Sequence, residues 1–95
     1  MNRIQFLLGK LAEEAVEIAK IALKCQQFGL LEIMEGQPLT NATRTHLELD
    51  DLVAVVRLLN KETDFDYMPN EQNIETKINK IAKFAEKSRT LKQLD

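Results

Sequence analysis

Apolar side chains recur at steps of three and four residues along three stretches of this chain, which is the spacing of one buried face of an α-helix. The first stretch predicts a helix at about residues 3–28. The second predicts a helix that is capped by Thr40 or Asn41 and ends near Lys61. The third runs from Ile74 to near Leu91 or beyond. We therefore expect an all-α fold with three main helices.

The second predicted helix is apolar on nearly every side. Its centre, LVAVVRLL at residues 52–59, is broken only by Arg57, and such a helix needs neighbours all round. A chain of 95 residues buries only about 60–65% of the surface that its unfolded form exposes, and two other helices are too few to surround this one. We expect one domain, residues 1–95, whose helices pair with those of a second copy into a four-helix core, as a homodimer or a dimer of dimers.

Charge and composition argue against several classes of partner. The chain has 13 basic and 15 acidic residues and a net charge of -2, with no long run of Lys or Arg, so a nucleic acid polymer is not an expected partner. No apolar run is long enough to span a bilayer, so we expect no membrane insertion. Cys25 is the only cysteine, which excludes an intrachain disulfide and fits a reducing cytoplasm.

Four carboxylates lie on the first two predicted helices, where an apolar core is otherwise expected. Glu14 and Glu17 are three residues apart, and so are Glu48 and Asp51. Residues three apart are neighbours on one helix face, so each pair can chelate one ion. If the two helices pack antiparallel, all four acids can surround a common point. Oxygen ligands favour hard ions, so the pattern predicts a site for Mg²⁺, with Mn²⁺ as a possible substitute.

An ordinary solvated face is the alternative for the first pair, because nearby lysines can act as intrahelical partners of its acids. Glu13 is rotated about 100° from Glu14 and is left out of the predicted ligands. His46 lies about 200° around the helix from Glu48 and is not an expected ligand. Cys25 is expected to be a small core residue. The connection after the first helix is long, and its apolar residues either pack over the core or line a substrate pocket.

At these positions the chain resembles a known family. The segments LAEEAVEIA and LELDDLVAVV look like the EExxE and ExxD motifs of the MazG-like all-α nucleoside triphosphate pyrophosphohydrolases. The likeness extends into FGLLEIMEGQPLTN and into a C-terminal run that contains Lys77, Lys80, Ser88 and Arg89. The resemblance is to the small single-domain group found in phages and bacteria, and it covers most of the chain.

The resemblance implies a MazG-like fold and hydrolysis between the α and β phosphates of a (deoxy)nucleoside triphosphate, which gives a monophosphate and pyrophosphate. Mg²⁺ would activate a water and neutralise charge on the phosphates. The implied metal ligands and catalytic residues are Glu14, Glu17, Glu48 and Asp51. The implied cations for the leaving pyrophosphate are Lys77, Lys80 and Arg89, supplied either by the same chain or by a neighbouring subunit, with Lys24 and Arg44 ranked behind them.

Two other functions stay open on the sequence. One is a phosphoribosyl-ATP pyrophosphohydrolase, which is a relative with similar acidic helices. The other is a non-catalytic helical oligomerisation module, in which the acids bind metal only structurally or lie on the surface. The two enzyme hypotheses require metal-dependent turnover, whereas the module requires none.

Overall fold

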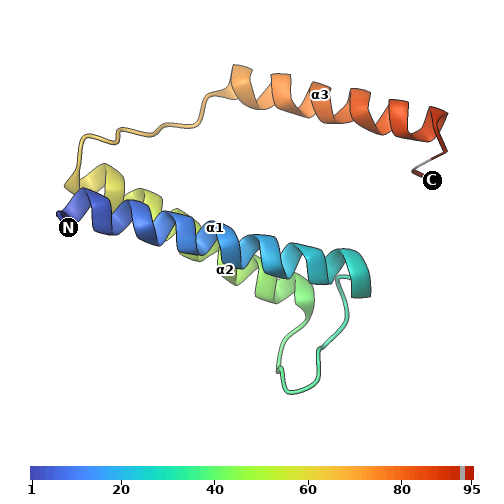
Figure 1. The fold of residues 1–95 in the computed structure, drawn as a ribbon, viewed down its shortest axis with the longest axis horizontal. Coiled ribbons are helices and arrows are strands. Elements are labelled where there is room, and N and C mark those ends of the chain that lie inside the picture. The colour runs from blue at the N-terminus through green and yellow to red at the C-terminus, as the bar shows by residue number, and fades with distance from the viewer. Residues whose placement is uncertain (93) are drawn as a thin grey trace.

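The computed structural model describes residues 1–92 and 94–95 of the chain (Figure 1). It contains the helices α1 (Arg3–Phe28), α2 (Asn41–Glu62) and α3 (Glu71–Thr90). No strand occurs among these described residues. The predicted all-α class and its three helices are therefore confirmed, and α3 begins one turn earlier than the apolar pattern indicated. Within the same residues, none of the helices has the length and apolar content that crossing a bilayer requires.

The connection between α1 and α2 is fixed by polar contacts at both of its ends. Gly29 ends α1 with a φ of 93°, a conformation that side chains rarely adopt. Thr40 is the N-cap of α2, and its hydroxyl accepts a hydrogen bond from the Thr43 N–H at 3.2 Å. Asn41 is fully buried instead, and its Nδ2 donates to the Gly29 carbonyl at 3.0 Å and to Glu32 Oε1 at 3.1 Å.

Helices α1 and α2 form an antiparallel hairpin, in which they lie side by side along most of their length (Figure 1). Leu7 of α1 packs with Val55 and Leu59 of α2 at one end of the hairpin, and the partly buried Leu11 joins this core. Ile21 is buried toward the other end. The buried apolar core is therefore small and lies entirely between these two helices.

Two side-chain contacts mark the ends of the hairpin and show its register. Arg3 Nη2 lies 2.8 Å from Glu62 Oε2 where α1 begins and α2 ends. Cys25 Sγ lies 3.3 Å from the Thr45 hydroxyl oxygen where α1 ends and α2 begins. Cys25 is half-buried in this contact, which agrees with the packing role expected for it. The middle turns of α1 consequently face the middle turns of α2.

Helix α3 lies apart from the hairpin. Residues 63–70 lead away from α2, and within the described part of the chain α3 packs against neither α1 nor α2 (Figure 1). Its large apolar side chains are exposed, including Ile78 at 51% and Ile81 at 56%. The radius of gyration is 16.9 Å, whereas a compact chain of this length is expected near about 12 Å. A single copy therefore leaves the apolar side of α3 without a core.

The apolar surface of α2 is also only partly covered. Val55 and Leu59 are buried against α1, but Leu49, Val53 and Leu58 are exposed. In the connection before α2, Leu30, Leu31 and Ile33 are exposed too, so they do not pack over the core of this chain. The described residues of one chain thus do not supply all the neighbours that the sequence requires for α2, and the second copy stays a prediction.

Candidate metal centre

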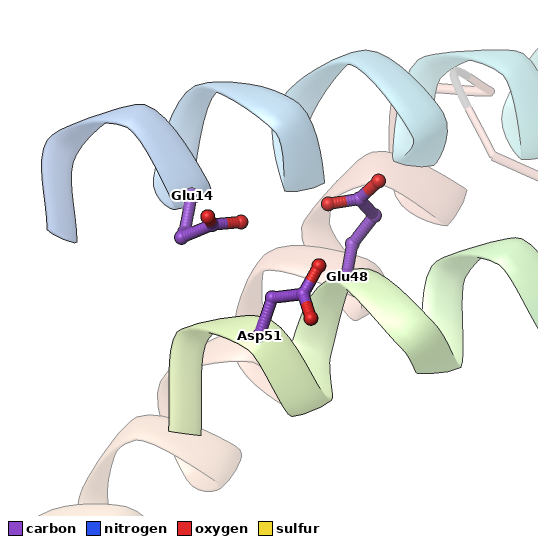
Figure 2. A group of neighbouring side chains, drawn as sticks. All are labelled: Glu14, Glu48 and Asp51. Carbon is purple, nitrogen blue, oxygen red and sulfur yellow. The ribbon is translucent and has the colours of Figure 1, made fainter. Parts of the chain in front are cut away.

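Three carboxylates meet across the middle of the hairpin. Glu14 projects from α1 toward α2, and Glu48 and Asp51 project from successive turns of α2 toward α1 (Figure 2). One oxygen from each carboxylate lies within 4.8 Å of the others. Glu14 and Glu48 are half-buried and Asp51 is exposed. The antiparallel register of α1 and α2 brings these acids, which we call the acidic cluster, to one point.

Glu17 is the predicted ligand that the structure leaves outside the acidic cluster. It is exposed, one turn along α1 from Glu14, and its Oε1 lies 3.7 Å from Lys20 Nζ. Helix α1 therefore contributes one acid to the cluster and α2 contributes two, whereas the sequence predicted two acids from each helix. Glu13 pairs with Lys10 at 3.1 Å and lies outside the cluster, as its position around the helix predicts.

The electrostatics of the cluster are unfavourable without a cation. None of the ion pairs formed within residues 1–92 and 94–95 involves Glu14, Glu48 or Asp51. The pKa of Glu14 is raised, first because partial burial removes water from its carboxylate and then because Asp51 and Glu48 repel its charge. A bound cation would relieve this repulsion.

The donor set fits a hard divalent ion. All three groups offer carboxylate oxygens, which Mg²⁺ and Mn²⁺ prefer over the softer nitrogen and sulfur ligands. Mg²⁺ is usually held by one or two carboxylates together with waters and substrate phosphates, so three acids are enough to hold one ion and leave positions for other oxygens. His46, the only histidine, is exposed and is not part of the cluster.

A cationic pocket adjoins the acidic cluster on the side of the connection between α1 and α2. Its volume is about 520 Å³. Glu17 and Glu48 lie at the end near the cluster, and Lys24 and Arg44 lie about one to two turns farther along their helices. The complete lining is Glu17, Lys20, Ile21, Leu23, Lys24, Gln27, Arg44 and Glu48. It includes no residue of the exposed apolar connection.

The cations that the resemblance favoured lie elsewhere in the chain. Lys77, Lys80 and Arg89 belong to α3, which packs against neither helix of the hairpin in the described residues. Arg89 Nη1 instead lies 3.3 Å from Glu86 Oε2 on its own helix. Lys24 and Arg44, ranked lower from the sequence, are the ones that line the pocket. Their spacing could have shown this, because Lys24 follows Glu17 by seven residues and Arg44 precedes Glu48 by four, which places each pair on one helix face.

Comparisons with protein-family models, with curated proteins and with solved structures give no match to this chain. The assignment of a function therefore depends on the residues of the acidic cluster and the cationic pocket.

Replacing Glu14 by glutamine is expected to stabilise the protein at neutral pH. Because the pKa of Glu14 is raised in the folded state, the folded protein binds this proton more tightly than the unfolded chain does. The free energy of unfolding therefore falls as the pH rises from the ordinary glutamate pKa through the raised one. Thermal melting should show a higher midpoint for Glu14→Gln at neutral pH and no difference in acid.

Glu13→Gln is the matched control, since this neighbouring acid pairs with Lys10 outside the cluster. It should bring a smaller gain at neutral pH than Glu14→Gln, because its charge raises the pKa of Glu14 less than Asp51 and Glu48 do. An equal gain in both variants would show that general negative charge on α1, and not the acidic cluster, destabilises the fold.

Proposed function

We propose that this protein is a Mg²⁺-dependent nucleoside triphosphate pyrophosphohydrolase of the MazG-like type. The observation that supports this best is the meeting of Glu14, Glu48 and Asp51 across the α1–α2 hairpin (Figure 2). These are residues of the two motifs that resemble the family. The cationic pocket beside them adds a place for phosphate oxygens.

The residues of the site divide into two roles. Glu14, Glu48 and Asp51 would hold the ion. Mg²⁺, when bound, neutralises phosphate charge and makes an attacking water more acidic. Glu17 lies outside the cluster, in the wall of the pocket beside Glu48, and we assign to its carboxylate the role of accepting the proton of the attacking water. The water oxygen bonds to the α phosphorus, the bond to the oxygen bridging the α and β phosphates breaks, and pyrophosphate leaves.

We also propose that the working form is a homodimer or a dimer of dimers. The apolar side of α3 has no partner in the described part of one chain. An apolar groove of about 710 Å³ lies between α2 and the segment after it, with Val53, Val56 and Phe65 in its lining. Burial of such surfaces is the main favourable term in association. A four-helix core shared by two copies would cover both of them.

The oligomer can be tested by one charge placed on α3. Light scattering after gel filtration should give the mass of at least two chains for the native protein. Ile78→Asp should reduce that mass to one chain, because a carboxylate in an apolar interface loses its water without gaining a partner. Thr76→Asp adds the same charge about 200° around the helix from Ile78 and should leave the mass unchanged. A native mass of one chain would contradict the proposal.

The enzyme proposal predicts pyrophosphate release that depends on the metal and on the acidic cluster. The substrates are canonical and modified nucleoside triphosphates and phosphoribosyl-ATP, each with Mg²⁺, Mn²⁺ or EDTA. Asp51→Asn removes a ligand charge and should lower kcat by more than about a hundredfold, because loss of a group that merely supports a ligand already costs about 10- to 100-fold. EDTA should abolish release in the native protein.

Asp50→Asn is the matched control, because Asp50 adjoins Asp51 in the chain and is likewise exposed, but lies outside the cluster. It should keep native activity. Release that is unaffected by EDTA or by Asp51→Asn would contradict the proposed site. No release from any substrate would favour the non-catalytic helical module.

A further inference from the structure

The cationic pocket has two chemically different ends. Glu17 and Glu48 supply negative charge at the end that adjoins the acidic cluster, and Lys24 and Arg44 supply positive charge at the other. Arg44 precedes Glu48 by four residues on α2, which separates their positions along the helix axis by about 6 Å. A ligand that spans the pocket would therefore meet a cation site at one end and side-chain cations at the other.

The two cations at the far end are available to an anion. Lys20 already pairs with Glu17 at 3.7 Å, whereas no ion pair within the described residues uses Lys24 or Arg44. Arg44 is half-buried, and its Nη1 donates to Met34 Sδ at 3.3 Å. A thioether is a weak acceptor, and a guanidinium has five N–H donors in a fixed planar fork. Phosphate oxygens would be far stronger acceptors for these groups.

The backbone amides at the start of α2 are not available to bind an anion in the cationic pocket. The Asn41 N–H donates to the Glu32 carbonyl at 2.8 Å, and the Ala42 N–H donates to the Leu30 carbonyl at 2.9 Å. The Thr43 N–H donates to the hydroxyl of the capping threonine. The first amides of the helix are thus already bonded, so an anion in this pocket depends on the side chains of Lys24 and Arg44.

We propose that Lys24 and Arg44 bind the terminal phosphates of the substrate in the cationic pocket. This inference rests on the proposed function, since a metal ion at Glu48 would hold the phosphate chain at its other end. It assigns a direction to the substrate, with the terminal phosphates toward the connection between α1 and α2 and the nucleoside away from it. It also assigns a substrate class, because nucleotides that lack the terminal phosphates leave Lys24 and Arg44 without partners.

Inorganic pyrophosphate is the probe, and calorimetric titration of the full chain in the presence of Mn²⁺ is the measurement. Arg44→Met and Lys24→Met should each weaken pyrophosphate binding about tenfold or more, because each loses a charge-assisted hydrogen bond. Inorganic phosphate should bind more weakly than pyrophosphate and depend less on both residues. Binding of Mn²⁺ alone, followed by electron paramagnetic resonance, should stay native in both variants.

The matched controls are Arg57→Met on α2 and Lys10→Met on α1, which remove the same charges outside the pocket. They should bind pyrophosphate as the native chain does. Equal binding by native protein and Arg44→Met overturns the inference, as does a native protein that does not bind pyrophosphate. Pyrophosphate binding that depends on Arg44 in a protein without turnover supports the pocket and instead counts against the proposed function.

Discussion

The antiparallel packing of α1 against α2 is the constraint on which the site depends. The small core of Leu7, Val55 and Leu59 sets the register at one end of the hairpin, and the contact of Cys25 with Thr45 marks it at the other. The acidic cluster lies between these two regions. A shift of one helix by a single turn, about 5.4 Å, would move one side of the cluster beyond the reach of the other. Apolar packing thus determines the geometry of an entirely polar site.

The same hairpin carries an electrostatic cost that a purely structural helix pair would avoid. Like-charged carboxylates that lie together without an ion pair in the described residues oppose folding. The pKa of Glu14 is raised by partial burial and then by this repulsion. The chain also buries little apolar surface to offset that cost. A bound metal ion would reduce the charge repulsion, and a second copy would add buried apolar surface. Each would stabilise the protein, because a ligand that binds only the folded state stabilises that state. Metal binding, self-association and folding are therefore expected to be coupled in this protein.

Local patterns in the sequence predicted the helices well, because apolar spacing and capping residues act within a few turns. The patterns also predicted the three members of the acidic cluster, Glu14, Glu48 and Asp51. Spacing within a few turns is again the reason, since Glu48 and Asp51 share a face of one helix. The patterns also grouped Glu17 with these acids, whereas the structure leaves its carboxylate outside the cluster, because helix spacing alone does not show which turn of α1 faces α2. The position of α3 could not be predicted from the sequence pattern either. The apolar face of an amphipathic helix indicates that the helix packs against something, but it does not indicate which surface it packs against.

The most direct measurement of the central claim is the anomalous diffraction of crystals grown with Mn²⁺. If the acidic cluster is a cation site, an anomalous peak should lie between α1 and α2, bonded to carboxylate oxygens of Glu14, Glu48 and Asp51. Mn²⁺ bound only at other surface acids, or no peak at the cluster under conditions in which the crystals contain the ion, would contradict it. The three carboxylates would then be an unpaired acidic surface of a helical protein.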